Sequence, residues 1–127
     1  MLTEYTNAST TQLLDYRTGA FNTNILDRLG IPAQIFTDIV YPGTFLDVLS
    51  NETAEEKGFA GMKVYHAASH DTASAVVAVP VLDRKFVYIS CGTWSLIGTE
   101  LDSSVVTEKA LKFNFTNEAG VGAPSVS

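Results

Sequence analysis

Two short polar clusters, each joined to an apolar segment, place the strongest constraint on what this chain can form. Residues 64–99 read VYHAASHDTASAVVAVPVLDRKFVYISCGTWSLIGT. The first cluster, Ser69-His70-Asp71-Thr72, precedes a run of small and β-branched residues, and the second, Cys91-Gly92-Thr93-Trp94-Ser95, lies between two strand-like runs. Asp71 and Thr93 are 22 positions apart. A helix and a strand span that interval and would return both clusters to one edge of a sheet.

The segments around the clusters carry recognisable start and stop signals. Residues 71–79 predict a helix, because Ser and Asp precede a run of small residues and Pro80 ends it, and residues 70–72 then form its N-terminal cap. The valines in this run equally suit a strand. Residues 86–90 and 96–101 predict two strands of a hairpin, with Gly92-Thr93 as the turn between them.

The N-terminal half predicts two short helices and a boundary. Asn22 or Thr23 caps the first helix, Gly30 ends it, and Pro32 begins the second, with Ile35, Phe36 and Ile39 facing inward. Residues 45–61 contain a short apolar run and then an acidic stretch, as expected of a hinge or exposed connection. Residues 62–67 predict a buried strand. We therefore expect residues 1–60 to end one domain and residues 61–127 to begin a second.

Composition excludes several classes of function. The chain has 127 residues, 46% of them hydrophobic, so a packed core is expected. The net charge of −6 comes without a basic patch, so neither nucleic acid nor an anionic membrane is a predicted partner. The single cysteine forms no intramolecular disulfide, and this usage fits a reducing, cytoplasmic location. No stretch is long and apolar enough to span a membrane, and the first ten residues lack signal-peptide features.

The first cluster suits proton transfer from a hydroxyl group. An aspartate at a helix start stays ionised, because backbone N–H groups favour its charge, and it can therefore act as a general base. The alternative is that Asp71 only caps the helix, which is what aspartate more often does at such a position. His70 and His66 would share one face of a strand, but no third ligand follows at metal spacing, so no metal site is predicted.

The second cluster suits contact with phosphate oxygens. Gly92 permits a close backbone approach and Thr93 adds a hydroxyl, although an ordinary hairpin turn explains the pair equally well. Cys91 ends an apolar strand with no basic neighbour in sequence, and predicts a buried, slowly reacting thiol. A hydrolase that uses His70 or His66 with Ser95 is another alternative. It is disfavoured because Ser95 lacks the Gly-x-Ser-x-Gly spacing.

Taken together, the segments SHDTASAVVAVP and FVYISCGTWSLIGTE resemble the FGGY family of carbohydrate kinases. The resemblance is closest to the members that phosphorylate L-rhamnulose. It extends to TEYTNASTTQLLDYRTG, LGIPAQIF, IVYPGT and FNFTNEAG, and so covers the chain to about residue 120. His70-Asp71-Thr72 and Gly92-Thr93-Trp94-Ser95 are its most specific motifs.

The resemblance implies an α/β fold of the actin-like, ribonuclease-H-like ATPase class, present here in part, as the end of the first domain and the start of the second. It implies that Asp71 is the base that takes the proton of the ketose 1-hydroxyl, which then attacks the γ-phosphorus of ATP. His70, Asp71 and Thr72 would bind the sugar, and Gly92 and Thr93 would bind ATP. Sugar and ATP are the implied small-molecule partners.

Two departures from the family pattern shape the functional expectation. The first phosphate turn, Asp-x-Gly-Thr, carries the family's Mg²⁺-binding aspartate and is absent here, as are the adenine-side glycines. The resemblance therefore implies Mg²⁺ held by residues outside this sequence, and we expect the chain by itself to be inactive. The alternative is a non-catalytic, kinase-like domain that binds a ligand or partner without turnover. An incomplete domain exposes strand edges and apolar surface, which predicts self-association.

Overall fold

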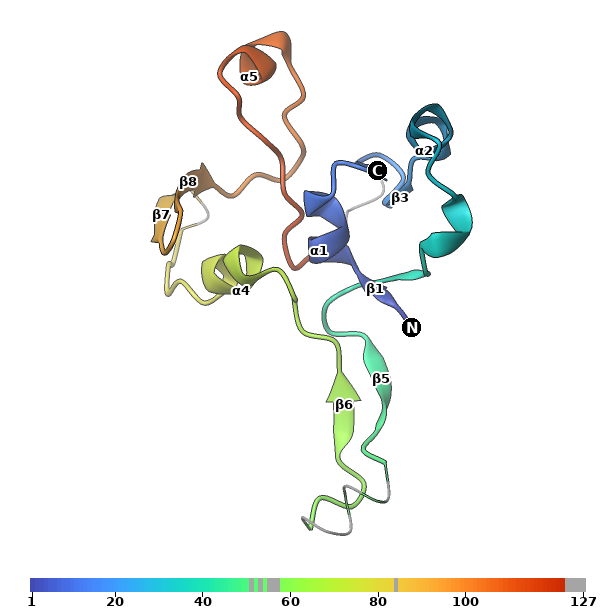
Figure 1. Ribbon diagram of the computed structural model, residues 1–127. Coiled ribbons are helices and arrows are strands. Elements are labelled where there is room, and N and C mark those ends of the chain that lie inside the picture. The colour runs from blue at the N-terminus through green and yellow to red at the C-terminus, as the bar shows by residue number, and fades with distance from the viewer. Residues whose placement is uncertain (51, 53, 55–57, 84, 123–127) are drawn as a thin grey trace.

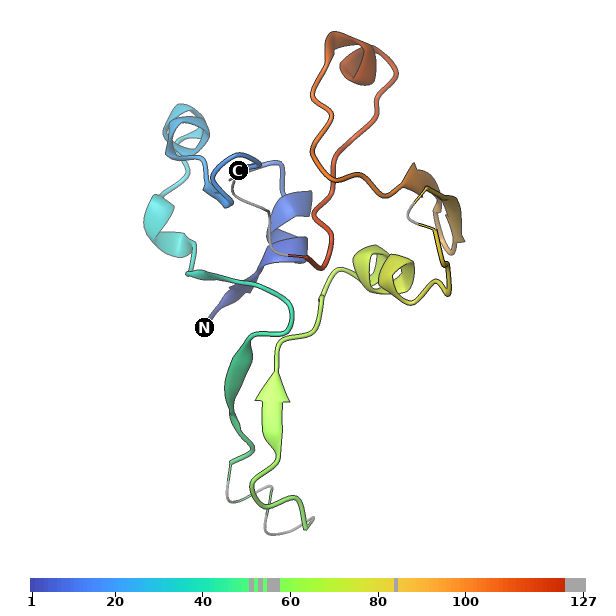
Figure 2. The same cartoon turned by 180° about the vertical axis from the view of Figure 1, so that it is seen from behind.

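The computed structural model describes residues 1–50, 52, 54, 58–83 and 85–122. Its elements radiate from α1 (Tyr5–Thr10), which lies near the centre of the molecule (Figure 1). The arm of β5 (Phe45–Val48) and β6 (Lys63–Tyr65) projects in one direction and the loop that carries α5 (Glu108–Lys112) in the opposite one. Helix α4 (Asp71–Val77) and the hairpin of β7 (Val87–Cys91) and β8 (Ser95–Thr99) lie on one side of α1. Helix α2 (Thr23–Leu29) lies on the other side, as the reverse view also shows (Figure 2).

The N-terminal segment forms the centre of this arrangement. Strand β1 (Thr3–Glu4) pairs in parallel with β4 (Ile39–Val40) and leads directly into α1. Within the described residues, burial is concentrated here. Tyr5 and Ala8 are buried apolar residues of α1, while Thr6 is completely buried and Glu4 nearly so. The Tyr5 ring packs against that of Tyr41, with centroids 4.6 Å apart.

The two short helices of the N-terminal half follow the predicted signals. A small antiparallel pair, β2 (Leu14–Asp15) with β3 (Ala20–Phe21), precedes α2 (Thr23–Leu29). The Asn22 side chain accepts a hydrogen bond from the Ile25 N–H, and Gly30 ends the helix at a φ of 66°, so both predicted caps are confirmed. A 3₁₀ helix, η1 (Ala33–Ile35), follows Pro32. Ile35 is 63% exposed, so its predicted inward orientation is wrong.

Residues predicted as a hinge contribute a strand instead. β5 (Phe45–Val48) pairs antiparallel with β6 (Lys63–Tyr65), and the Phe45 and Tyr65 rings meet edge to face. The predicted strand at residues 62–67 is therefore present as Lys63–Tyr65, but Tyr65 is 53% exposed, so the predicted burial is wrong. Positions 51, 53 and 55–57 of the predicted hinge lie outside the described residues.

The segment with the two polar clusters forms a helix and a hairpin, as predicted. Helix α4 comprises Asp71–Val77, and the antiparallel strands β7 (Val87–Cys91) and β8 (Ser95–Thr99) follow it. The register pairs Cys91 with Ser95 and Tyr88 with Gly98. Tyr88 lies over Gly98 so closely that a Cβ at position 98 would overlap the Tyr88 phenol, which gives this glycine a packing role.

Within the described ranges the strands form four separate two-stranded sheets, and this arrangement limits the core. A two-stranded sheet buries little apolar surface unless another layer packs on it. In the part of the chain that the structure describes, the buried apolar side chains are few: Tyr5, Ala8, Leu26, Ala54 and Ala73. The core expected from composition is therefore small. No helix among the described residues has the length and apolar character needed to cross a membrane.

The position of Cys91 also reflects the small size of the core. It is exposed at the end of β7, so the burial predicted from its apolar neighbours is wrong. We expect a thiol reagent to label native Cys91 about as fast as the urea-unfolded chain, because access and not burial controls the reaction. Labelling followed by mass spectrometry measures both rates, and a native thiol that reacts only after urea is added would contradict the exposed position.

Candidate active site

A buried carboxylate lies beneath the first polar cluster. Glu4 occupies the N-cap position of α1, with an extended backbone, and its carboxylate accepts the backbone N–H groups of Thr6 (2.9 Å) and Asn7 (3.2 Å). The Thr6 hydroxyl donates to the same carboxylate. Glutamate is not among the preferred N-cap residues, so its presence here indicates a role beyond capping the start of the helix.

The same carboxylate holds a segment 65 residues further along the chain. Ser69 donates to Glu4 Oε2 through its backbone N–H (3.1 Å) and through its hydroxyl (2.8 Å). The Thr6 hydroxyl oxygen accepts the His70 N–H (3.1 Å), and the Asn7 amide donates to the Ser69 hydroxyl (3.0 Å). The start of the first cluster is thus fixed to α1 by four hydrogen bonds.

These hydrogen bonds change the acidity of Glu4. Burial alone would raise the pKa of the carboxyl, but donation from the side chains and N–H groups of Thr6 and Ser69 outweighs burial and lowers the pKa from 4.5 to about 2. Glu4 is therefore ionised throughout the physiological range and serves as an acceptor.

The His70 ring lies between two carboxylates. Its Nδ1 is 3.5 Å from Glu118 Oε2, and its Nε2 is 3.8 Å from Asp71 Oδ1. Nδ1 is buried and lacks a hydrogen-bond partner among the described residues. A ring in this position can carry a proton between the two carboxylates, or donate to a ligand hydroxyl from Nε2.

Glu118 reaches this position because its neighbours are anchored. The Asn117 side chain makes two hydrogen bonds with the backbone of Val105, which closes the loop around α5. The Ala119 N–H then donates to the Ser9 hydroxyl on α1 (3.1 Å). Burial raises the pKa of Tyr88 on β7, and the negative charge of Glu118 raises it further. Glu118 therefore lies near both α4 and the β7–β8 hairpin.

Asp71 itself faces solvent. It is the first residue of α4, its side chain is 98% exposed, and its Oδ1 accepts the Thr72 N–H at 2.7 Å. The N-cap position belongs to His70, whose side chain makes no cap hydrogen bond. Thr72 is buried and its hydroxyl lies 3.4 Å from the Asp71 carboxylate. Asp71 thus presents an accessible carboxylate on a backbone that is held from below.

The second cluster forms the tip of the β7–β8 hairpin. Gly92, Thr93 and Trp94 connect the strands, the Gly92 N–H donates to the Trp94 carbonyl (2.9 Å), and the Trp94 side chain is largely exposed. Among the described residues, no hydrogen bond or ion pair joins Gly92 or Thr93 to His70, Asp71 or Thr72. The structure therefore fixes the first cluster through α1, and the predicted meeting of the two clusters remains a prediction.

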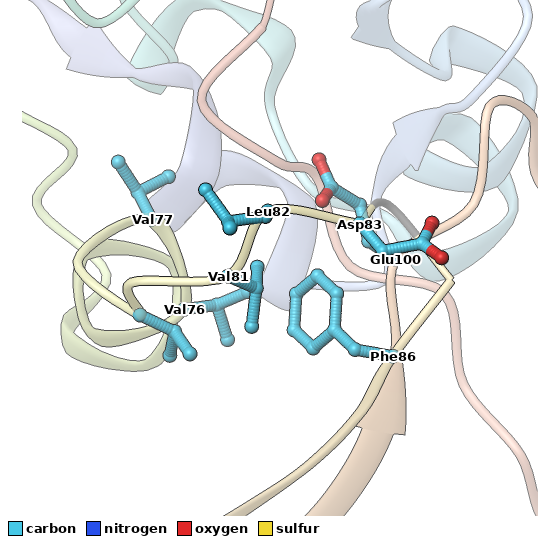
Figure 3. Close-up of a pocket in the computed structure, with 8 residues that line it drawn as sticks. Val76, Val77, Val81, Leu82, Asp83, Phe86 and Glu100 are labelled. Carbon is cyan, nitrogen blue, oxygen red and sulfur yellow. The ribbon is translucent and has the colours of Figure 1, made fainter.

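A shallow hollow of about 380 Å³ lies at the other end of α4. Valine, leucine and phenylalanine side chains form its floor, and Asp83 and Glu100 stand at its rim (Figure 3). None of the predicted site residues lines it. In the described part of the chain, no group of three or more His, Cys, Asp or Glu side chains is placed to hold a metal ion.

Sequence reasoning missed three residues of this site, namely Glu4, Thr6 and Glu118. The available signal was a glutamate immediately before a Thr-rich helical stretch, a position where Asp, Ser or Thr is more usual. Their long-range partners cannot be derived from local spacing, because the contacts of Glu4 and Thr6 span more than sixty residues.

Comparison with known proteins confirms the predicted resemblance. Residues 1–78 match the model of the N-terminal domain of the FGGY family of carbohydrate kinases. The match continues through α4, and the predicted domain boundary at residue 60 remains a prediction. Rhamnulokinase from Bacteroides thetaiotaomicron is 45% identical over 121 residues, which are 95% of this chain and 25% of that protein. Rhamnulokinase from Halalkalibacterium halodurans is 47% identical over 119 residues, 93% of this chain and 25% of that protein.

The structural comparison supports the predicted fold class. A ligand-bound xylulose kinase from Lactobacillus acidophilus superposes with a TM-score of 0.69 at 24% identity, over 86% of this chain and 22% of that one. The fold is thus part of an actin-like, α/β sugar-kinase fold, as predicted. The chain spans about a quarter of the length of the curated relatives it matches.

The environment of Glu4 predicts an acid-sensitive contribution to stability. Its pKa is lowered in the folded chain from 4.5 to about 2, so its contribution to the free energy of unfolding is complete above pH 4.5 and is lost as the pH falls toward 2. The expected loss is about 3 kcal/mol, at one pKa unit per 1.36 kcal/mol. Carbon-detected NMR titration of the Glu4 carboxyl measures its pKa in the folded chain. Urea unfolding of the wild type and of Glu4→Gln across this pH range measures the loss of stability. A carboxyl that titrates near 4.5 would contradict the buried arrangement.

Proposed function

The chain belongs to the FGGY family of carbohydrate kinases, and from this membership we propose that it forms part of a kinase that transfers the γ-phosphate of ATP to the 1-hydroxyl of a ketose. L-Rhamnulose is the proposed substrate, because the two rhamnulokinases described above are 45% and 47% identical to this chain over nearly its whole length. The reaction product would be L-rhamnulose 1-phosphate, formed in the cytoplasm.

The observation that carries the proposal is the exposed Asp71 carboxylate on a fixed backbone. A general base must reach its substrate, and the Asp71 side chain is 98% exposed at the first residue of α4. Its Oδ1 is engaged by the Thr72 N–H, and in the described part of the chain no hydrogen bond engages Oδ2. Oδ2 is therefore the oxygen proposed to receive the substrate proton.

The proposed step is an in-line phosphoryl transfer. The ketose 1-hydroxyl gives its proton to Asp71 while its oxygen forms a bond to the γ-phosphorus of ATP. The bond from that phosphorus to the oxygen bridging the β- and γ-phosphates breaks, and ADP leaves. Because phosphoryl transfer depends mainly on alignment and charge stabilisation, the protein's contribution is chiefly to hold the two substrates in line.

The remaining predicted residues receive supporting roles in this proposal. His70 donates from Nε2 to a sugar hydroxyl, while its Nδ1 lies 3.5 Å from Glu118 Oε2 on the other side of the ring. Thr72 is buried beside Asp71, so its hydroxyl orients the carboxylate from below while its backbone borders the sugar. Gly92 and Thr93, at the hairpin tip, are proposed to contact the ATP phosphates.

Mg²⁺ neutralises phosphate charge in ATP-dependent kinases. The described residues of this chain offer no cluster of three or more potential ligands for it, and the family's Asp-x-Gly-Thr turn does not occur in the sequence. We therefore assign no metal ligand to this chain.

The alternative is that the chain binds a ligand or a partner chain without turnover. The absence of the Asp-x-Gly-Thr turn from the sequence favours it for these 127 residues taken alone. Isothermal titration with L-rhamnulose and with ATP measures binding, and a coupled assay measures turnover. Binding of sugar without ADP release would favour this alternative for the isolated chain.

We predict that the 127-residue chain by itself releases no ADP in response to L-rhamnulose. The reason is the missing phosphate turn with its Mg²⁺-binding aspartate. A coupled ADP-release assay with Mg-ATP and the ketose is the test, with Asp71→Asn as the control for contaminating kinases. Sugar-dependent turnover that Asp71→Asn abolishes would overturn this prediction.

Substitution at position 71 separates catalysis from local structure. In an active kinase that carries this segment, Asp71→Asn should lower kcat by ~10²–10⁴-fold and leave the KM for ATP nearly unchanged, because the amide is isosteric but accepts no proton. Thr93→Ala should instead raise the KM for ATP. If Asp71 only stabilises the helix start, Asn would be nearly silent and Ala would cost ~1 kcal/mol of stability. Measuring kcat and Tm for both variants distinguishes the two roles, and near wild-type kcat in the Asn variant would remove Asp71 from the mechanism.

A further inference from the structure

The Glu4 carboxylate accepts more hydrogen bonds than the end of a helix requires. We propose that Glu4 and Thr6 are positioning residues for the His70-Asp71 segment, and that they hold the backbone from which the sugar-binding side chains project. This inference rests on the proposed function for its consequence in sugar binding. Its structural part concerns only the backbone of Ser69 and His70, and is tested separately below.

The two carboxylate oxygens of Glu4 accept different sets of hydrogen-bond donors. Oε1 accepts the Thr6 N–H, which satisfies the start of α1. Oε2 accepts the Thr6 hydroxyl, the Asn7 N–H, and both the N–H and the hydroxyl of Ser69. Helix capping therefore accounts for the two backbone N–H groups of α1, and the two bonds from Ser69 connect to a segment 65 residues away.

Thr6 extends this contact by one residue. Its hydroxyl donates to Glu4 and accepts the His70 N–H at 3.1 Å, so both functions of the hydroxyl are used. Thr6 is fully buried, and water cannot replace it at either bond. Glu4 thus fixes Ser69 directly and His70 through Thr6, and Asp71 is the next residue.

Few other hydrogen bonds define the start of α4 among the described residues. The segment between β6, which ends at Tyr65, and α4, which begins at Asp71, has no regular secondary structure. His70 occupies the N-cap position without a side-chain cap bond. The Ser74 hydroxyl bonds the Ala68 carbonyl within this same region. The direction in which α4 begins is therefore set mainly by the bonds from α1.

The donors around the Glu4 side chain require a carboxylate at this position. Oε1 and Oε2 both face donors, so both positions must be acceptors. A glutamine offers one oxygen and one NH₂ group, so it would set its NH₂ against donors on one side. A buried donor left without an acceptor is costly, and the segment it belongs to would loosen.

The test uses the full 127-residue chain and amide hydrogen exchange followed by NMR. Thr6→Val is nearly isosteric, keeps the backbone cap of α1, and removes only the hydroxyl. We expect exchange at the His70 N–H to accelerate by about tenfold, as one lost hydrogen bond allows, while amides in the last turn of α1 stay unchanged. Glu4→Gln should accelerate exchange at both Ser69 and His70.

Two matched controls isolate the effect. Thr10→Val makes the same substitution on the same helix, where the hydroxyl bonds the Asn7 carbonyl and no other group among the described residues. Asp15→Asn neutralises a carboxylate that, within the same described ranges, accepts a single local N–H, from Arg17. Both controls should leave exchange at Ser69 and His70 at the wild-type rate. Unchanged His70 exchange in Thr6→Val, or equal acceleration in Thr10→Val, overturns the positioning role.

Titration with L-rhamnulose and with ATP adds the functional readout. We expect Thr6→Val to weaken sugar binding several-fold and to leave ATP binding unchanged, with Tm as the check on folding. Faster His70 exchange with unchanged sugar affinity would show a merely structural contact and overturn the inference. If the wild-type chain binds no sugar, the proposed function fails for this chain. The exchange rates alone then test whether Thr6 positions the backbone of His70. Faster exchange at His70 in Thr6→Val but not in Thr10→Val supports this positioning.

Discussion

The arrangement of this chain depends on one buried carboxylate. Glu4 ends β1, begins α1, and binds Ser69, so a single side chain joins the N-terminus to the segment that leads into α4. The same short helix receives two further distant segments, through the Tyr41 ring on Tyr5 and the Ala119 N–H on Ser9. Because the apolar core is small, these polar contacts do much of what packing does in a larger domain.

Two carboxylates near one another acquire different roles from their surroundings. Glu4 is buried and surrounded by donors, so its charge is fixed and it acts as an acceptor for the backbone. Asp71 lies two residues beyond Ser69, but its side chain is almost fully exposed and has one oxygen facing solvent. The environment thus assigns support to one carboxylate and, in the proposed function, proton transfer to the other.

Whether the sequence predicts a feature depends on how far apart in sequence the interacting residues lie. Asn22, Gly30 and the helix at 71–77 carry local signals within a few residues, and the structure has them where those signals placed them. The tip at Gly92 and Thr93 was likewise predicted from two flanking apolar runs. The bonds from Glu4 to Ser69 and from His70 to Thr6 have no local signal. The burial of Cys91 was predicted wrongly because an apolar strand is buried only where another layer covers it.

The two polar clusters are supported in unequal ways, and this difference bears on how they would act together. His70 and Asp71 are tied to α1 through Ser69 and Thr6, whereas Thr93 is held by the register of a two-stranded hairpin whose outer residues are largely exposed. Phosphoryl transfer requires the attacking oxygen, the phosphorus and the leaving oxygen to align. On the proposed function, a fixed sugar-binding cluster and a less constrained phosphate-binding turn would meet this requirement if the turn adjusts to the nucleotide while the base stays in place. On the proposed function, the rigidity that Glu4 provides is therefore needed on the sugar side, where a small displacement of Asp71 would separate the base from its hydroxyl.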